Sequence, residues 1–594
     1  MKKLVMIVVT AFVLFNANPV LATTQAIPEI EWKKSLGGAS SEYAQNTQPT
    51  KDGGYIVVGS TYSTDGDVSG NHGNEDAWVV KLDGKGEMEW QKCLGGSLYD
   101  KAYSIRETND SGYIIAGYTN SNDGDVSGNH GNMDAWLVKL DAYGEIIWQK
   151  CLGGSQNEDV FDIRQTDDGG YILVGSTYSV DGNVVGCHGD GSGDYGELDA
   201  WVVKLKENGD IDWQRCLGGS AYDVAQSIQL TKDGGYIIAG KTYSQDGDVS
   251  EPIGEFDAWI IKLKETGEIE WEKCLGGTSH DHAYNIQLTD DGGYVFVGST
   301  WSSDGDVSGY RRAYDVWVVK LKENGDIDWQ KCLGGANHDQ AYTIQLTNDG
   351  GYIVAGQTQS QDGDVSGHHG YNDIWVVKLD EKGEINWQKS LGGTENDQAS
   401  SIQLTDDGGY VLAGHVYSQD GDVLSNHGSW DVWIVKFEGN GDKAPASNGD
   451  ASMNRPRAII CERTFTGQTL ATFRDDAFGL LKVIDPETGV IDFRAPLRSE
   501  EKDVRVRISY ADIQMKVDVG AKNLLIEYRG RAIQIPMITF ECEELLSEMP
   551  THEEAMIEIH LIEKEDGSLE KVIQLIVVEQ VDEKTKLVHR MNVQ

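Results

Sequence analysis

The sequence repeats a loop whose oxygen-bearing side chains are spaced as in a calcium-binding loop. Each copy begins Asp-Gly-Asp-Val-Ser-Gly and reaches a further aspartate at its twelfth position. Oxygen side chains at positions one, three, five and twelve, with glycine at six, follow the ligand order of such loops. The pattern therefore predicts calcium as a cofactor, held by these residues: Asp65, Asp67, Ser69, Asp76, Asp123, Asp125, Ser127, Asp134, Asp304, Asp306, Ser308, Asp315, Asp362, Asp364, Ser366 and Asp373.

The same loops also have a purely structural interpretation. Position twelve is Asp rather than the longer Glu, and position nine is glycine, as at Gly73 and Gly131. Asp and Gly are common in tight turns that bind nothing. The loops that begin at Asp181, Asp246 and Asp420 match the pattern less well.

A second set of acids lies ten residues after a repeated tryptophan. We expect each acid to begin the strand nearest the axis of the fold, so that the set forms a ring at one mouth of a central channel. Such a ring could recruit a cation, or supply a carboxylate pair for glycoside hydrolysis. The alternative is that each acid accepts N–H bonds from the neighbouring Gly-Gly linker. The seven acids are Glu42, Asp100, Glu158, Asp223, Asp281, Asp339 and Asp397.

These residues belong to a sevenfold internal repeat. The repeated tryptophans are 58 residues apart at every step except one, where the spacing is 65. Turn residues and alternating apolar positions predict four strands per unit, and four-stranded units of this length are typical of propeller blades. The tryptophans that mark the units are Trp32, Trp90, Trp148, Trp213, Trp271, Trp329 and Trp387.

The ends of the array predict a closed ring. Residues 30–33 are an isolated copy of the fourth strand of a unit, while the last unit stops at Phe437 without that strand. We therefore expect an all-β, seven-bladed propeller over residues 28–437, in which the first strand completes the seventh blade. Closure of this kind removes exposed sheet edges.

Three further segments flank the repeats. Residues 1–22 read as a secretory signal peptide, and no later apolar run is long enough to span a bilayer. Residues 438–454 are rich in Gly, Asn, Asp, Ser and Ala and are predicted to be a linker. Residues 455–594 alternate apolar and polar positions, which predicts a β-rich, sandwich-like domain. The location expected is secreted, with attachment to a cell surface left open.

The charge limits the partners. The chain has a formal net charge of −46, and residues 451–594 hold only 26 acidic and 19 basic side chains, so the repeats carry most of the excess. A field of this sign repels nucleic acid and anionic membranes, and favours cations, basic proteins or neutral glycans.

Cysteines and irregular loops break the repeat in informative ways. Five cysteines occupy one equivalent site in five successive units, too far apart to be bridged to one another, so we expect buried thiols and no disulfide framework. Cys461 and Cys542 could pair in the C-terminal segment. Specificity is expected at the irregular loops, namely residues 251–253, residues 310–312 and the insertion at 187–199.

The repeat resembles a group of secreted bacterial β-propeller proteins. Its units run from Asp52-Gly53-Gly54-Tyr55 through Asp65-Gly66-Asp67-Val68-Ser69-Gly70-Asn71-His72-Gly73 to Asp76-Ala77-Trp78. The resemblance covers the whole repeat region and implies an exported or cell-surface propeller. It transfers no catalytic residues.

Two functions remain open from the sequence. The first is a non-catalytic binding or scaffold propeller for a glycan or protein, with aromatic side chains near the loops that could stack on sugar rings: Tyr62, Tyr178, Trp301 and Trp430. The second is a carbohydrate-active hydrolase that uses carboxylates at the channel mouth, with Asp223, Asp281 and Asp339 as the best placed.

Overall fold

The computed structural model describes residues 27–188, 198–423 and 425–439, and the backbone of ten strands between 460 and 592. All regular elements in these ranges are β-strands. The predicted signal peptide, and the linker apart from residues 438–439, lie outside the described residues, as does all but the strands of the C-terminal segment. Within the described part of the chain, no helix is long and apolar enough to cross a membrane.

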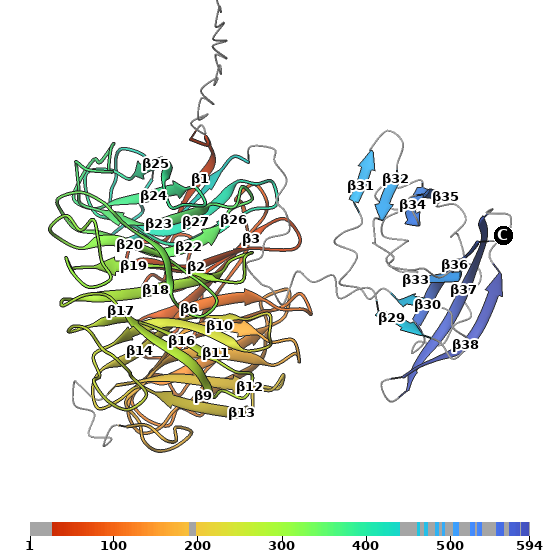
Figure 1. Ribbon diagram of the computed structural model, residues 1–594, viewed down its shortest axis with the longest axis horizontal. Helices are drawn as coiled ribbons and strands as arrows, with labels where there is room; N and C mark the ends of the chain where they lie inside the picture. The colour runs from red at the N-terminus through yellow and green to blue at the C-terminus, as the bar shows by residue number, and fades with distance from the viewer. Residues whose placement is uncertain are drawn as a thin grey trace, which may run out of the picture.

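The first 28 strands form seven four-stranded antiparallel sheets, which confirms the predicted seven-bladed propeller (Figure 1). Blades 1 to 3 are β2 (Glu42–Pro49), β3 (Tyr55–Thr61), β4 (Asp76–Leu82) and β5 (Met88–Leu94); β6 (Asp100–Glu107), β7 (Tyr113–Thr119), β8 (Asp134–Leu140) and β9 (Ile146–Leu152); and β10 (Glu158–Gln165), β11 (Tyr171–Thr177), β12 (Asp199–Leu205) and β13 (Ile211–Leu217). Blades 4 to 6 are β14 (Asp223–Leu230), β15 (Tyr236–Thr242), β16 (Asp257–Leu263) and β17 (Ile269–Leu275); β18 (Asp281–Leu288), β19 (Tyr294–Thr300), β20 (Asp315–Leu321) and β21 (Ile327–Leu333); and β22 (Asp339–Leu346), β23 (Tyr352–Thr358), β24 (Asp373–Leu379) and β25 (Ile385–Leu391).

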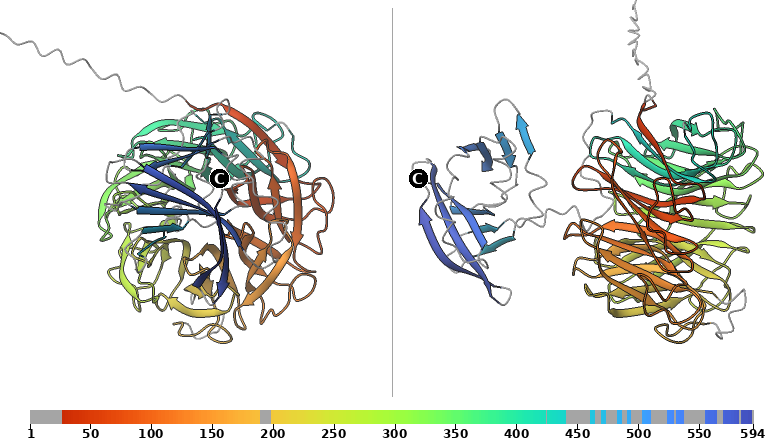
Figure 2. Two further views of the ribbon diagram at one scale, coloured as in Figure 1. Left: turned by 90° about the vertical axis from the view of Figure 1, so that its right-hand side faces the viewer. Right: turned by 180° about the vertical axis from the view of Figure 1, so that it is seen from behind.

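Blade 7 joins the two ends of the array. It combines β26 (Asp397–Leu404), β27 (Tyr410–Val416) and β28 (Asp431–Phe437) with the N-terminal β1 (Ile30–Leu36) as its outer strand. β1 pairs antiparallel with β28, and Trp32 lies opposite Lys436. The colour in Figure 2 runs once around the ring, so that the red first strand meets the blue-green last blade.

The turn between the first and second strands of each blade is held by a buried lysine. In blade 1, Asp52 accepts hydrogen bonds from Thr50 Oγ1 and from Gly54 N, and pairs with Lys81 Nζ at 2.9 Å. Lys81 is almost fully buried, and it also donates to the carbonyl of Leu82. The repeated Thr-x-Asp-Gly-Gly-Tyr sequence is therefore explained by its role in the fold.

The outer strand is fastened by a second repeated contact. The indole N–H of Trp78 donates to Gln91 Oε1 at 2.8 Å, and Gln91 Nε2 donates to the carbonyl of Ser69 at 3.0 Å. This contact links the Asp-x-Trp motif, the Trp-Gln-Lys motif and the Ser-Gly of the long loop. All three repeated motifs thus have structural partners.

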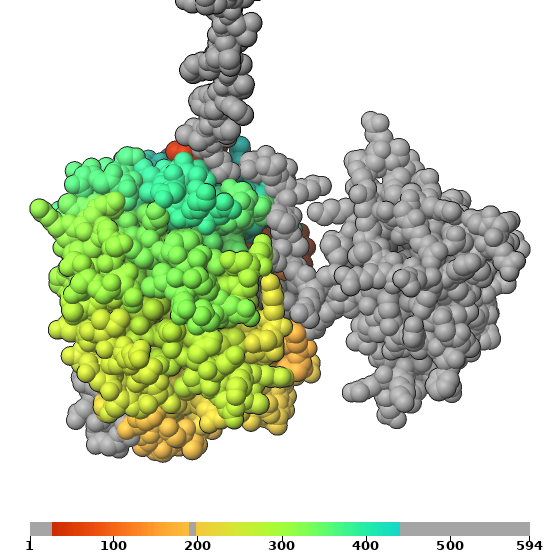
Figure 3. Space-filling view, viewed as in Figure 1, coloured from red at the N-terminus to blue at the C-terminus, as the bar shows by residue number. Residues whose placement is uncertain are grey.

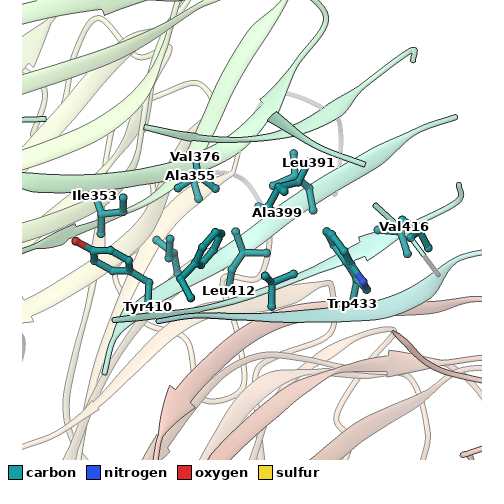
Figure 4. Close-up of a cluster of buried hydrophobic side chains, with 14 of the residues drawn as sticks. Ile353, Ala355, Val376, Leu391, Ala399, Tyr410, Leu412, Val416 and Trp433 are labelled. Atoms are coloured by element: carbon teal, nitrogen blue, oxygen red, sulfur yellow. The ribbon is translucent and has the colours of Figure 1, made fainter. Parts of the chain in front are cut away.

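Apolar side chains fill the space between adjacent blades. Figure 4 shows the cluster between blades 6 and 7, where Trp433, Leu412 and Val416 face Val376 and Leu391. A fully buried large apolar side chain contributes about 1.5–3 kcal/mol to folding, and similar clusters occur between the other pairs of blades. The space-filling view shows neighbouring blades packed into one continuous surface (Figure 3).

The C-terminal segment contains ten strands. One sheet has the order β29 (Ile460–Arg463), β30 (Thr469–Thr472), β33 (Asp503–Ser509), β36 (Glu554–Glu563), β37 (Leu569–Val581) and β38 (Lys584–Asn592); the other has the order β31 (Lys482–Asp485), β32 (Val490–Phe493), β34 (Asn523–Tyr528) and β35 (Arg531–Pro536). The strands accord with a β-rich segment. A sandwich-like domain over 455–594 stays a prediction.

Candidate functional site

Two kinds of connection emerge on one face of the ring, which we call the upper face. They are the linkers between blades, such as residues 95–99, and the long loops between the second and third strands, such as residues 62–75. In the first long loop, Asp65 Oδ1 accepts a hydrogen bond from Ala39 N at 2.8 Å, and Asp67 Oδ2 accepts one from Gly37 N at 3.1 Å. The first two carboxylates of the loop therefore hold the linker that enters the blade.

The other two predicted calcium ligands of this loop have different partners. Ser69 Oγ accepts a hydrogen bond from Gln91 Nε2, and Asp76 Oδ2 accepts one from His72 N at 2.9 Å. The four oxygen side chains are thus each bonded to a different part of the blade.

All four predicted calcium loops repeat this arrangement. The aspartate at position one accepts a hydrogen bond from a linker N–H (Asp65, Asp123, Asp304 and Asp362), and the aspartate at position three accepts one from the N–H of a linker glycine (Asp67, Asp125, Asp306 and Asp364). The serine at position five accepts one from a glutamine side chain (Ser69, Ser127, Ser308 and Ser366). The aspartate at position twelve accepts one from the backbone N–H of the residue four positions earlier (Asp76, Asp134, Asp315 and Asp373). Within the described ranges, the only His, Cys, Asp and Glu side chains that bring three ligand atoms within 4.8 Å of one another are Cys187, Asp199 and Cys216. Calcium binding inside a single loop stays a prediction, and an ion there would compete with these N–H donors.

The ring acids lie at the predicted strand starts but are completely buried. Asp100 accepts hydrogen bonds from Gly96 N at 2.7 Å and Ser121 Oγ at 2.8 Å, and from Thr119 Oγ1. Every member accepts the glycine N–H of its own linker, and every one has no exposed surface: Glu42, Asp100, Glu158, Asp223, Asp281, Asp339 and Asp397. Burial raises the pKa of Asp223, Asp281 and Asp339. The geometry is that of structural hydrogen-bond acceptors.

The side chain of the residue after each ring acid points away from the linker that the acid bonds, and its residue type differs from blade to blade. Side chains alternate along a strand, so these positions and the next alternate ones face the channel that the innermost strands enclose. Equivalent rings of adjacent blades meet there, with Tyr103 and Phe161 at 5.4 Å and Tyr284 and Tyr342 at 5.5 Å between centroids. The residues directly after the seven ring acids are Tyr43, Lys101, Asp159, Val224, His282, Gln340 and Gln398.

The channel contains charged groups that the repeat does not require. Lys101 Nζ lies 5.2 Å from the centre of the Tyr103 ring, and Asp159 on the next blade interacts with Lys101. Burial lowers the pKa of Lys101 and raises that of Asp159 to about 6. Shifts of this kind are frequent at binding and catalytic sites.

Lys241 is a second desolvated cation at the mouth. Its Nζ atom lies 5.3 Å from the Tyr222 ring centre and 5.5 Å from that of Phe256. Burial lowers the pKa of Lys241. This ammonium is solvated by aromatic faces, which is a favourable cation–π arrangement.

An array of aromatic and imidazole rings lies beside Lys241 on blades 4 and 5. Phe256 packs against Tyr243, at 4.9 Å, and against His280, at 5.5 Å. His280 is stacked on Trp301, which in turn packs against a tyrosine of its own blade at 5.2 Å. Tyr243 and Trp301 are nearly half exposed. We call this set the mouth array: Tyr222, Tyr243, Phe256, His280, Trp301 and Tyr314.

The other sequence-predicted aromatics lie on the same face but are not members of this array. Tyr62 donates its hydroxyl hydrogen to Glu75 at 2.6 Å, and Trp430 packs against Tyr43 and His415 on blades 1 and 7. Tyr178 lies at the equivalent position of blade 3. Of the four predicted residues, only Trp301 belongs to the mouth array.

No protein-family model matches the chain. Over 284 residues it is 24% identical to the regulatory protein FlaEY of Caulobacter vibrioides, a match that spans 46% of this chain but only 28% of that protein. Among solved structures it is similar to the Pan2 WD40 domain of Neurospora crassa, with 11% identity, coverage of 68% and 96%, and a TM-score of 0.37. It is also similar to puromycin hydrolase, with 12% identity, coverage of 71% and 58%, and a TM-score of 0.40. None of these similarities identifies a ligand or an activity.

A cavity of about 490 Å³ lies on the opposite, lower face, beside the turns of blades 5 and 6. Its walls include the Lys320–Asp291 pair, at 2.9 Å, and the packed rings of Trp329 and Tyr352. Equivalent pairs occur in other blades, so this cavity is built from repeat residues. The residues that vary lie at the mouth of the channel on the upper face.

The cysteine prediction needs a correction. Cys216 forms a disulfide with Cys187, with 4.9 Å between the Cα atoms, whereas no disulfide was expected at the repeated position. The other repeated cysteines, Cys93, Cys151, Cys274 and Cys332, are free. The insertion places a second cysteine beside its own blade, which comparison between blades does not reveal. Cys461 and Cys542 carry no described side chains.

Proposed function

We propose that this protein is an exported, non-catalytic binding propeller that holds a glycan at the mouth array. The supporting observation is the contrast between two neighbouring positions of the innermost strand. The acid that opens the strand is the same type in every blade and is buried by its own linker. The next residue differs in every blade but two and faces the channel. Ligand recognition requires such departures from symmetry, and the fold does not.

The chemistry of the mouth favours a sugar. Exposed aromatic faces such as Trp301 and Tyr243 stack on the apolar faces of sugar rings, while neighbouring imidazoles provide hydrogen bonds. Burial lowers the pKa of His282 to about 3, so that its ring is neutral at physiological pH. A protein partner is the alternative that a binding screen would separate from this one.

Hydrolysis is less well supported than binding. A glycosidase needs two carboxyl groups that reach the scissile bond, but Asp223, Asp281 and Asp339 have no exposed surface and are bonded to their own linkers. Among the seven residues directly after the ring acids, Asp159 is the one carboxylate, and the buried Asp162 farther along the same strand is paired with Arg106 at 2.9 Å. A single carboxylate supports positioning of a ligand more readily than acid and base catalysis.

A glycan array probed with the chain from Thr23, followed by calorimetry on the best oligosaccharide, tests this proposal. Trp301→Ala is expected to weaken binding about tenfold, equivalent to about 1.4 kcal/mol. Tyr143→Ala is the matched control because Tyr143 is 77% exposed in a turn of the lower face. Failure to bind any glycan, or equal losses in both variants, would overturn the proposal.

A further inference from the structure

Pairs of buried carboxylates lie between neighbouring blades, one from each blade. Between blades 1 and 2, the first glycine of the linker separates Asp76 from Asp100. A Cβ atom placed on Gly95 would lie 3.0 Å from Asp76 Oδ1 and 2.6 Å from Asp100 Oδ2. Both aspartates have no exposed surface. Two buried carboxylates on either side of one glycine need a positively charged partner or a shared proton to offset their lost hydration.

One oxygen of the first acid in most pairs has no protein donor. Asp76 uses Oδ2 to accept the His72 N–H, whereas its Oδ1 is buried without a hydrogen bond. The same atom is without a partner in the described equivalents Asp134, Asp199, Asp257, Asp315 and Asp431. Buried oxygens of charged groups are rarely left in this state.

At one interface the protein supplies a cation of its own. Between blades 5 and 6, Arg311 Nη1 donates to the carbonyl of Gly334 at 2.8 Å and to Asp364 Oδ2 at 2.7 Å. Gly334 is the first glycine of that linker. Asp364 is the third residue of the Asp-Gly-Asp motif in the long loop of blade 6. Arg311 therefore places a positive charge near the buried Asp315, although Asp315 Oδ1 itself still has no hydrogen-bond donor.

Histidine replaces this arginine at five interfaces. His72 Nδ1 lies 2.7 Å from Asp76 Oδ2, and the separations are similar at His130, His369 and His427, with His188 farther away at 3.5 Å. Imidazole can carry the compensating charge when it is protonated.

The interface between blades 4 and 5 has neither group. Ile253 occupies the position of Arg311, and its N–H donates to Asp257 Oδ2 at 2.7 Å. Asp281 and Asp306 complete the acids there, and Asp306 Oδ2 accepts from Gly276 N at 3.3 Å.

We propose that a hard cation of the Ca²⁺ type binds between blades 4 and 5, at the place that the Arg311 guanidinium takes at the next interface. Its ligands would be a carboxylate oxygen of Asp306 and the carbonyl oxygen of Gly276, the equivalents of the two atoms that Arg311 bonds, together with the nearby Asp257, whose Oδ1 has no protein donor. Oxygen donors of this kind suit calcium, and water completes the shell. The ligands come from two blades and the linker between them, so this site differs from one formed within a single long loop. It does not depend on the proposed glycan function.

Ile253→Arg tests the site by supplying the missing charge, as Arg311 does. Calcium bound to the full chain from Thr23 is counted by equilibrium dialysis, with thermal unfolding followed in calcium and in chelator. The variant is expected to bind one calcium ion fewer than the original chain and to unfold at a higher temperature in chelator. Ile253→Leu keeps the apolar side chain and is expected to leave the number of bound ions unchanged.

Arg311→Ile provides the reciprocal test, because it recreates the blade 4–5 arrangement at the next interface. It is expected to bind one calcium ion more than the original chain and to recover thermal stability in calcium. Asp306→Asn is expected to remove one ion by changing a ligand without filling the site. The proposal is overturned if the original chain binds no calcium, or if Ile253→Arg and Ile253→Leu bind equal numbers of ions.

Discussion

The ammonium group of Lys241 lies 5.3 Å from the centre of the Tyr222 ring, and among the described residues no carboxylate pairs with it. This contrasts with the lysines of the lower turns, such as Lys81, each of which bonds an aspartate. The cation–π contacts stabilise the ammonium group, and the proposed glycan would meet both the cation and the rings.

Lys241 should be an unusually reactive amine. Because burial lowers its pKa, a larger fraction of the group is unprotonated near pH 7.5 than for an ordinary lysine. Limited acylation followed by peptide mass spectrometry should label Lys241 ahead of the exposed Lys206, and a bound oligosaccharide should protect it. Labelling of Lys241 that a saturating ligand does not change would place the ligand elsewhere.

Removing the first strand should open the ring. A chain that begins at Gly37 lacks β1 and exposes the edge of β28, whose backbone groups then have no partner. We expect aggregation in gel filtration, and recovery of a monodisperse species when a peptide of residues 27–36 is added. A chain that begins at Ile27 is the control. Unchanged behaviour of the shortened chain would show that closure contributes little.

Gly95→Ala should destabilise the protein more than an alanine placed at a glycine in open space. The added methyl group would collide with both Asp100 and Asp76, at a backbone φ of +156°. Gly128 also has a positive φ, of +88°, but open space around it, so its substitution measures the backbone strain without the collision. We expect Gly128→Ala to cost about 1 kcal/mol of unfolding free energy and Gly95→Ala about 3 kcal/mol or more, measured by urea unfolding. Equal losses of unfolding free energy in the two variants would show that Asp76 and Asp100 move aside at little energetic cost.

Asp159 should make the protein less stable as the pH rises. Its pKa is near 6 in the folded chain and 3.8 in the reference state, because burial penalises the charged form. Between about pH 4 and 6 the folded state therefore binds more protons than the unfolded state, and the unfolding free energy falls as the pH increases. Asp159→Asn should flatten this fall, whereas Glu145→Gln, a change at an exposed acid, should not. Parallel pH profiles of the original chain and Asp159→Asn would contradict the assignment.

The Cys187–Cys216 disulfide should stabilise the insertion of blade 3. The two residues are 29 apart, and closing a loop of that length contributes about 3–4 kcal/mol in the chain-entropy model. Reducing agent should therefore lower the unfolding temperature of the original chain but leave Cys187→Ser unaffected. Cys93→Ser, which removes a free thiol, should respond to reducing agent as the original chain does.

The fold followed from the sequence because the repeat encodes it locally. Turn residues such as Asp52 and Gly54 and the isolated strand at Trp32 specify four strands per blade and their closure. The side that each residue faces was harder to predict. The ring acids were expected at the channel mouth or, in the alternative, bonded to their own Gly-Gly linkers; Asp100 follows the alternative, and strand alternation gives the channel position to Lys101.

Of the mouth array, only Trp301 was predicted from the sequence, and the other members were missed for the same reason that the fold was clear. The repeated residues attract attention in the sequence, yet Lys241 and His280 matter because they depart from the repeat. A comparison of the seven blades position by position would have found them. The disulfide depended on where the insertion places Cys187, and the spacing of the other cysteines carries no information about that.

A crystal structure of the chain from Thr23 with its tightest-binding oligosaccharide tests the account most directly. We predict sugar rings stacked on Trp301 and Tyr243, with polar groups of the ligand toward Lys241. Density for the sugar at the lower face beside Trp329, with the mouth array unoccupied, would contradict the central claim.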